Sequence, residues 1–155
     1  MFGENDADVL IPDGTDEVVY SDITIADDIT LASVDVQVNI THSYIGDLII
    51  EITSPEGTTV RLHNRNGGAS ANIVGWYDSE LSVDGPGALA DFAGESTLGE
   101  WELWVSDNAG ADVGTVNEWC VQALGGGGRR AAAAGPSSLP VRGLRRASAT
   151  SATPS

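Results

Sequence analysis

The sequence contains no lysine, and most of its few cations lie near one end. Seven arginines stand against 23 aspartates and glutamates, so the 155 residues carry a formal net charge of −16. Five of the arginines follow Gly125, so residues 1–124 alone carry 2 − 23 = −21. A surface of that sign repels the phosphates of nucleic acids and of anionic lipids. We therefore expect neither nucleic acid nor a membrane as a partner, and the acidic surface fits a medium rich in salt or calcium.

Cysteine is nearly absent as well. The single Cys120 cannot form an intrachain disulfide and excludes a zinc site built from several cysteines. Its neighbours in "NEWCVQAL" predict a packed, inert thiol.

Long apolar runs are also missing. No stretch reaches the ~18 consecutive apolar residues of a membrane span. The first ten residues, "MFGENDADVL", have neither the basic start nor the apolar centre of a signal peptide. If the protein is exported, we expect its signal to lie upstream in a longer precursor.

Alternation of apolar and polar residues is the main structural signal. Val34, Val36, Val38 and Ile40 alternate with polar residues, as in a strand with one buried face. No segment keeps a helical period. Further alternating segments lie at residues 23–25, 29–31, 48–52, 60–62, 101–105 and 119–123. Seven short strands separated by Gly, Pro, Asn and Asp predict an all-β fold, a jelly-roll-like antiparallel β-sandwich.

The connections between these strands differ greatly in length. Residues 54–57, "SPEG", have the proline and glycine positions of a tight type I turn. Residues 65–96 are a glycine-rich crossing too long for a hairpin. We expect Trp76, Leu89 and Phe92 to anchor this crossing as an ordered loop over one end of the sandwich.

The composition also predicts where the domain begins and ends. Residues 125–155 have no aromatic residue and mix Gly, Ala, Ser, Pro and Arg, which predicts a disordered C-terminal tail or linker. Residues 1–8 are expected to be an N-terminal extension, so the predicted domain spans residues 9–124.

Two polar residues in "THSYIGDL", His42 and Asp47, resemble part of a catalytic triad. Nucleophilic catalysis needs a nucleophile beside a base and a third group that orients the base. The chain has only one other histidine, His63, and "GESTLG" (94–99) is not the G-x-S-x-G elbow of a serine hydrolase. We therefore predict a structural role, in which His42 bonds a neighbouring backbone group, Gly46 allows a turn and Asp47 accepts backbone amides.

Several motifs together resemble one known family. The segments "DVQVNITHSYIGDLIIEITSPEGTTVRLHNRNGG" and "FAGESTLGEWELWVSDNAGADVGTVNEWCVQAL" are similar to the P domain, or Homo B domain, of proprotein convertases and bacterial subtilisin-like proteases. The motifs are, in order, IPDG, H-S-x-x-G-D-L, S-P-x-G-T, G-E-S, G-x-W-x-L-x-V-x-D and D-x-G-x-x-x-x-W. The similarity covers about residues 9–124. It departs at "WYDSEL", where consecutive aspartates are expected.

The resemblance implies a jelly roll of about eight strands without catalytic residues of its own. It implies a partner, namely a neighbouring secreted subtilisin-like serine protease or another exported domain that this domain stabilises or assists. Any label of serine-type endopeptidase would then come from that neighbour, since fold does not fix function. The expected location is outside the cell or on its surface.

Calcium is the expected cofactor, because a hard cation of this size takes about six to eight oxygen ligands and the loops are rich in carboxylates. Chemistry and resemblance together suggest a first set of ligands from separate loops: Asp13, Asp47, Asp78 and Glu80. A second set is Asp107 and Asp112, for which capping of turns is an equally good explanation. With few histidine and carboxylate neighbours in the sequence, no zinc site is expected.

The aromatic residues allow a competing function. Trp101 and Trp119 share a face with aliphatic neighbours and are expected to be buried, whereas Trp104 points the other way. Trp76, Tyr77 and Trp104 together suggest an exposed platform for stacking sugar rings. Three hypotheses remain: an accessory domain of a protease, a carbohydrate or surface adhesion module, and a protease in its own right, against which the missing triad argues.

Overall fold

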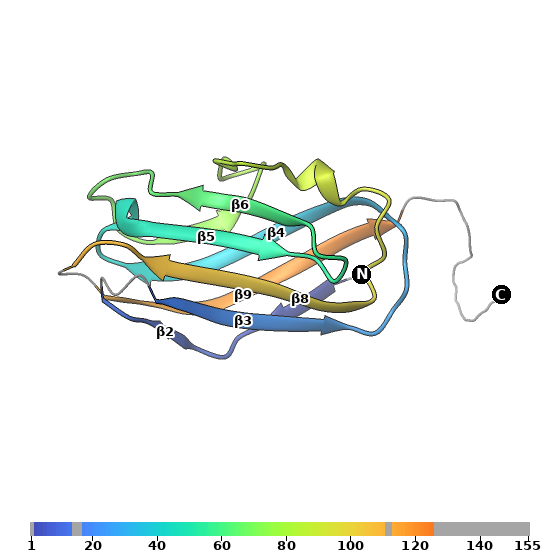
Figure 1. Ribbon diagram of the computed structural model, residues 1–155, viewed down its shortest axis with the longest axis horizontal. Helices are drawn as coiled ribbons and strands as arrows, with labels where there is room; N and C mark the ends of the chain where they lie inside the picture. The colour runs from blue at the N-terminus through green and yellow to red at the C-terminus, as the bar shows by residue number, and fades with distance from the viewer. Residues whose placement is uncertain (1, 14–16, 111–112, 126–155) are drawn as a thin grey trace.

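The computed structural model describes residues 2–13, 17–110 and 113–125 and shows two antiparallel sheets packed face to face (Figure 1). The five-stranded sheet has the order β1 (Phe2–Asn5), β9 (Gly114–Gly125), β4 (Leu31–His42) and β7 (Ile73–Trp76), with β2 (Val9–Ile11) also paired to β9. The four-stranded sheet has the order β3 (Val18–Ile25), β8 (Gly99–Asp107), β5 (Leu48–Thr53) and β6 (Thr59–Asn64). Two short 3-10 helices, η1 (Ile45–Asp47) and η2 (Leu89–Phe92), lie in the connections. The predicted all-β, jelly-roll-like antiparallel sandwich is confirmed.

The chain passes repeatedly from one sheet to the other. After β3 the chain crosses to β4, returns to β5 and β6, crosses again to β7, returns to β8 and crosses to β9. The turn between β5 and β6 is the predicted one, since the Gly57 amide donates to the Ser54 carbonyl at 2.9 Å.

The core lies between the sheets and follows the alternation of the sequence. Val34, Val36, Val38 and Ile40 on β4 are 3 % exposed or less. Trp101 and Trp119, from opposite sheets, are also buried, as expected. Burying each of these side chains contributes roughly 1.5–3 kcal/mol, so this row of β4 is a large part of the driving force.

The long crossing is anchored much as predicted, with one difference. Leu89 and Phe92 are buried, and Phe92 meets Trp101 edge to face with ring centroids 5.4 Å apart. The third anchor is Tyr77 at 2 % exposure, whereas its neighbour Trp76 is only half-buried. The crossing also contains β7, a strand that the sequence pattern did not predict.

The structure also differs from the predicted strands near the N-terminus. Residues 1–8, expected to be an extension, contain β1, which pairs with residues 119–122 of β9. Ile29, predicted to begin a strand with Leu31, lies before β4 and only Thr30 makes an isolated bridge there. Most of the predicted tail lies outside the described residues.

Candidate functional site

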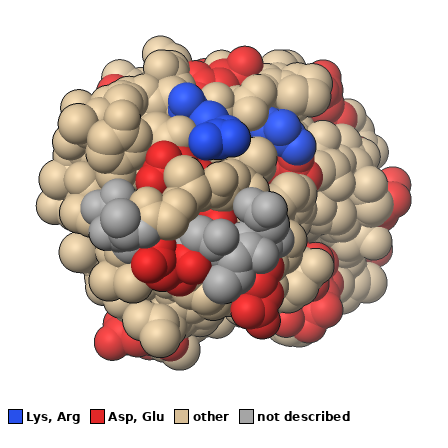
Figure 2. All heavy atoms as spheres, turned by 60° about the vertical axis from the view of Figure 1, so that its left-hand side comes forward, with Lys and Arg blue, Asp and Glu red and all other residues tan. Residues whose placement is uncertain are grey.

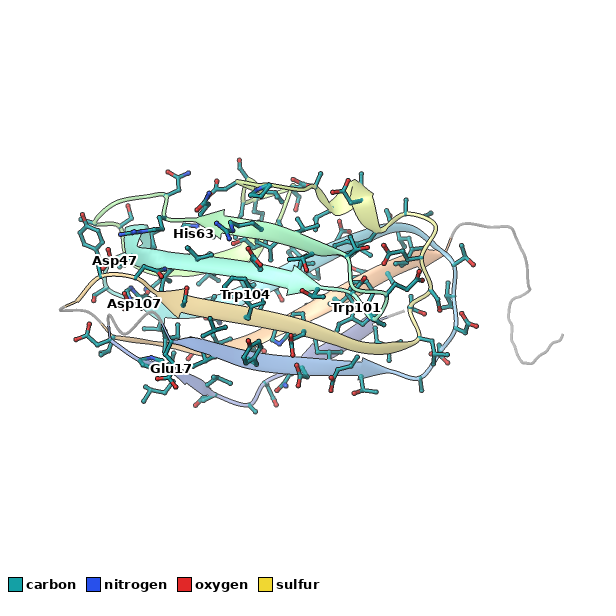
Figure 3. All side chains as sticks on the ribbon, in the orientation of Figure 1. Glu17, Asp47, His63, Trp101, Trp104 and Asp107 are labelled. Carbon is teal, nitrogen blue, oxygen red and sulfur yellow. The ribbon has the colours of Figure 1, made fainter. Side chains whose placement is uncertain are left out.

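The signature residues of the sequence gather at one end of the sandwich, where several carboxylates also lie. In the larger sheet His42 pairs with Gly114, and Gly114 with Ile11, two residues before Asp13. In the smaller sheet Leu48 pairs with Asp107. We call this part of the molecule the acidic end and define it by four residues: Asp13, Glu17, Asp47 and Asp107. Figure 3 shows three of them, Glu17, Asp47 and Asp107, at the left of the view.

Figure 2 brings this end forward. Red carboxylates gather across it, and the blue atoms of Arg61 and Arg65, the two arginines among the described residues, lie together on one side.

A buried pair, His42 and Asp107, is the centre of the acidic end. Nε2 of His42 lies 2.9 Å from Oδ2 of Asp107, and both side chains are 0 % exposed. The amide of Tyr44 donates to Nδ1 of His42 at 3.0 Å, so the ring proton is on Nε2 and is donated to Asp107. The other oxygen of Asp107 accepts the amide of Ala109 at 3.2 Å. The predicted bond from His42 to a neighbouring backbone group is therefore confirmed, but its carboxylate partner is Asp107 rather than Asp47.

This geometry does not suit catalysis. Both nitrogens of His42 are occupied, so neither is available to accept a proton from a nucleophile. The serine of the G-E-S motif, Ser96, bridges Thr30 at the start of β4, whereas His42 is the last residue of that strand. Ser96 and His42 therefore lie at opposite ends of the twelve-residue strand β4, which is about 35 Å long. Ser96 and His42 are thus too far apart to act together.

A glycine makes room for the histidine ring. A Cβ atom on Gly114 would lie 2.6 Å from Cδ2 of His42 and 2.3 Å from the carbonyl oxygen of Thr41. Real carbon atoms do not approach so closely, so β4 and β9 can pair at this register only with glycine at position 114. This contact explains the glycine of the D-x-G-x-x-x-x-W motif.

Gly46 is required for close approach rather than for a turn with unusual dihedral angles. It lies in η1, where its amide donates to the carbonyl of Gly68 at 3.0 Å. A Cβ atom on Gly46 would lie 2.9 Å from the α-carbon of Gly68. The other histidine supports the same helix, because Nε2 of His63 donates to the carbonyl of Ile45 at 2.8 Å. The H-S-x-x-G-D-L motif therefore joins two loops.

The first set of proposed calcium ligands is not brought together. Asp78 and Glu80 come directly after β7 and Tyr77. The amide of Tyr77 donates to the carbonyl of Val36 on β4. Val36 lies six residues before His42, the residue of β4 at the acidic end. That separation corresponds to about 20 Å of strand. Glu80 has another role, since its Oε1 accepts the amide of Trp76 at 2.9 Å and closes the free edge of β7.

The remaining proposed calcium ligands that lie within the described residues are not grouped either. Both oxygens of Asp107 are occupied by His42 and Ala109, which leaves it poorly suited as a ligand. Asp112 lies outside the described residues. Asp47 is buried at 6 % exposure, and its carbonyl accepts the amide of Asn108 at 2.9 Å. Among the residues that the structure describes, no three or more His, Cys, Asp or Glu side chains are grouped to hold a metal ion.

A second cluster, which the sequence analysis missed, closes the opposite end of the sandwich. The Glu95 carboxylate accepts the hydroxyl of Ser54 at 2.6 Å and that of Thr58 through its other oxygen. The backbone carbonyl of Glu95 also accepts the amide of Leu31 at 2.8 Å. Glu95 thus links the β5–β6 turn to the start of β4. The signal was present in the sequence, because the S-P-x-G-T and G-E-S motifs contain all three side chains of this cluster.

The predicted aromatic platform does not form from its three members. Trp76 lies on β7 of the larger sheet, Trp104 lies on β8 of the smaller sheet, and Tyr77 is buried in the core. The hydroxyl of Tyr77 is buried without a hydrogen-bond partner among the described residues. Burial, with a smaller contribution from Asp84, raises the pKa of Tyr77 above its ordinary value.

Cys120 is packed, as predicted. It is 3 % exposed, and its thiol donates to Oε1 of Gln37 at 3.4 Å. Burial, with smaller contributions from Glu4 and Glu118, raises the pKa of the thiol to about 11. Because the thiolate is the reactive form, this thiol is a poor nucleophile at neutral pH.

Comparison with known proteins identifies the architecture. Residues 31–123, which include the buried pair, Gly114 and the Glu95 cluster, match the family described as proprotein convertase P-domain. The chain belongs to this P-domain family. Among solved structures, the serine protease of Aeromonas sobria has the same fold, with a TM-score of 0.60 and 21 % identity over 81 % of this chain and 26 % of the other.

Its curated relatives include proteins named as proteases of different kinds. The chain is 40 % identical over 119 residues to leupeptin-inactivating enzyme 1 of Streptomyces exfoliatus, covering 75 % of this chain and 24 % of that protein. It is 37 % identical over 103 residues to a calcium-dependent protease of a Nostoc species, covering 64 % and 15 %. It is 34 % identical over 116 residues to the transglutaminase-activating metalloprotease of Streptomyces mobaraensis, covering 75 % and 14 %.

The segment that matches this chain is therefore a part of larger proteins in these relatives, since this chain spans less than a quarter of each of the three. Their names include both a metalloprotease and a calcium-dependent protease, so the domain alone does not identify a catalytic class. The described residues include no helix with the length and apolar character needed to cross a membrane.

Proposed function

We propose that this P domain is a non-catalytic accessory domain that stabilises a neighbouring domain of an exported protease. The observation that carries the proposal is the small share of each protease relative that the domain covers, between 14 % and 24 % in the three named above. The remaining parts of those relatives have room for a complete catalytic domain. The closed His42–Asp107 pair supports the same view, because it offers no free base.

The catalytic class of the neighbour is a finer part of the proposal. We favour a secreted subtilisin-like serine protease, because the motifs resemble P domains of that group and the domain shares its fold with part of a serine protease. The metalloprotease relative supports the view that the same kind of domain also accompanies catalytic domains of another class.

The experiment that tests this function uses a relative in which the catalytic part is present. In leupeptin-inactivating enzyme 1, the matched segment is deleted in one variant and replaced by residues 2–125 of this chain in a second. We expect the deletion variant to lose activity faster on heating and the chimera to regain most of the half-life of the parent enzyme. A second chimera carrying His42→Ala serves as the matched control, because it disrupts only the fold of the inserted domain.

Turnover separates stabilisation from catalysis in the same experiment. An accessory domain leaves kcat/KM for a short peptide nearly equal in the parent enzyme and in the chimera. The isolated chain is expected to hydrolyse neither casein nor peptides. Equal half-lives of the parent and the deletion variant, or peptide hydrolysis by the isolated chain that disappears on His42→Ala, would contradict the proposal.

Calcium binding remains part of the proposal, with fewer candidate ligands. The relatives include proteins named calcium-dependent proteases. At the acidic end, Asp13 follows β2, Glu17 directly precedes β3 and Asp47 lies in η1 after β4. Hard oxygen ligands of this kind suit calcium better than zinc. Asp78 and Glu80 are left out, because they lie on a different part of the sandwich.

A further inference from the structure

The outer face of the smaller sheet carries a row of side chains that crosses all four strands. Tyr20 on β3 lies directly opposite Trp104 on β8, and Trp104 lies opposite Glu51 on β5. Glu51 in turn lies opposite Arg61 on β6. Figure 3 shows Trp104 on the near face of β8, while the buried Trp101 belongs to the inner face. The sequence analysis found Trp104 but missed Tyr20, because strand register decides which residue lies beside it.

The two aromatic side chains are accessible to a partner. Tyr20 is 55 % exposed and Trp104 is half-buried. Because they lie directly opposite each other on antiparallel strands, their Cβ atoms are about 4.5–5.5 Å apart, within the reach of one bound side chain. The other side of Trp104 is bounded by the ion pair of Glu51 with Arg61, whose NH2 nitrogen lies 2.6 Å from the Glu51 carboxylate.

The neighbouring rows of the same face carry several carboxylates and no basic side chain. Asp22 on β3 lies directly opposite Glu102 on β8, and Glu100 lies on β8 two residues before it. Like charges directly opposite each other in a sheet destabilise it. Burial, then the charges of Asp22 and Glu100, and a hydrogen bond with the Asp22 side chain raise the pKa of Glu102 above its ordinary value. A cation bound at this face would relieve the repulsion between these carboxylates.

No cation of the described chain balances these carboxylates. The described residues contain two arginines and no lysine, and Arg61 is already paired with Glu51. Arg65 follows β6, at the opposite edge of this sheet from β3. A guanidinium group fits the combination of groups on this face. It stacks on Trp and Tyr rings through cation–π attraction, and it donates two parallel hydrogen bonds to a carboxylate. An anionic partner is excluded by the charge of the domain, and a neutral one leaves Asp22 and Glu102 unbalanced.

We propose that the outer face of the smaller sheet, with Tyr20, Trp104, Asp22 and Glu102 as its contact residues, is a docking surface for an arginine-bearing peptide segment of another polypeptide. The inference rests on the register and exposure of this sheet and holds whichever catalytic domain accompanies the P domain. It concerns a different part of the molecule from the acidic end.

The test uses the full chain and a fluorescein-labelled ten-residue peptide that contains three arginines among glycine and serine. Binding is followed by fluorescence anisotropy at 50 mM and 500 mM NaCl. Exposed cation–π and ion-pair contacts each contribute about 0.5–1 kcal/mol, so Tyr20→Ala, Asp22→Asn and Glu102→Gln should each weaken binding about two- to fivefold. The triple variant should weaken binding about tenfold or more, and high salt should weaken binding to the wild type. Asp35→Asn, an exposed carboxylate on the larger sheet, is the matched control and should change Kd less than about twofold.

The remaining arms separate other occupants of the same face. Citrulline in place of arginine keeps the shape of the peptide and removes its charge, so it should abolish binding. A neutral glucan hexasaccharide should not compete. Equal weakening by Asp35→Asn, or competition by the hexasaccharide, would overturn the proposal in favour of diffuse attraction or of a carbohydrate site.

A final variant tests whether the chain covers its own docking surface. Five arginines lie at positions 129, 130, 142, 145 and 146. Their replacement by alanine in the full chain should leave the Kd of the labelled peptide unchanged. Tighter peptide binding by that variant would assign the face to the chain's own C-terminal residues and would overturn the assignment to another polypeptide.

Discussion

The side chains of His42 and Asp107, 65 residues apart in the sequence, form a hydrogen bond of 2.9 Å with both residues closed to solvent. This contact joins the last residue of β4 to the last residue of β8 and therefore links the two sheets at the acidic end. Because removing one partner would leave a buried polar group unpaired, we expect that breaking this contact lowers the stability of the fold.

Removal of the histidine tests this role. His42→Ala leaves the buried carboxylate of Asp107 without its main donor, so we expect a loss of about 3 kcal/mol or more in the free energy of unfolding. Asp107→Asn keeps an oxygen that accepts from His42 and should cost less. Urea denaturation measures both, and equal small losses below about 1 kcal/mol would argue against a buried, coupled pair.

Gly114→Ala should be among the most destabilising small substitutions in this chain. The added Cβ would lie 2.3 Å from the carbonyl oxygen of Thr41, so β4 or β9 must shift, which costs about 1–3 kcal/mol. Gly110→Ala is the matched control, because a Cβ there has no heavy atom within 4 Å. Thermal unfolding of the two variants should differ clearly, and equal melting temperatures would contradict the observed register of β4 and β9.

Tyr77→Phe should stabilise the protein. The variant removes a buried hydroxyl that has no partner among the described residues, and such a group costs about 1–3 kcal/mol. The effect should grow above pH 10, because the unfolded chain then loses the tyrosine proton while the folded chain, with its raised pKa, keeps it. The wild type therefore loses stability as the pH rises through this range, and Tyr77→Phe should lose less. Lower stability of the variant at pH 7 would reveal a partner for this hydroxyl.

The Glu95 cluster gives a second stability test at the opposite end of the sandwich. Glu95→Ala leaves the hydroxyls of Ser54 and Thr58 without their acceptor and should cost about 1.5–3 kcal/mol, as for bonds to a charged group. Glu100→Ala, at an exposed position of β8, should stay within about 0.5 kcal/mol of the wild type. Similar losses of unfolding free energy in the two variants would show that the Glu95 cluster contributes no more to stability than an ordinary surface residue.

Calcium binding is tested by a specific rise in stability. An ion that binds only the folded domain raises the free energy of unfolding by about 2.7 kcal/mol when its concentration is a hundred times its Kd. Magnesium at equal ionic strength is the control, since any salt screens the acidic surface. We expect the excess of calcium over magnesium to shrink in Asp47→Asn and to persist in Asp78→Asn. Equal shifts with the two ions in the wild type would mean screening alone.

Much of the fold is contained in the local pattern of the sequence. Alternation on β4 and the turn at residues 54–57 predicted a sandwich, because the side chains of a strand point to its two faces in turn. The same alternation correctly separated the buried Trp101 from Trp104. The motifs also placed the chain in the P-domain family, since they are distributed along most of the domain.

Contacts between strands that are distant in the sequence required the tertiary structure. The packing of the two sheets, and not the motif that contains Asp47, brings His42 on β4 to Asp107 on β8. The pairing of β4 with β9 places Gly114 against the His42 ring, so glycine is needed at that position. In the same way, only the register of β3 with β8 brings Tyr20 beside Trp104. The sequence alone determined which residues share a face of each strand, because the period of two is a local property. The tertiary structure decided which faces and ends meet, because register and sheet order depend on packing across the whole core.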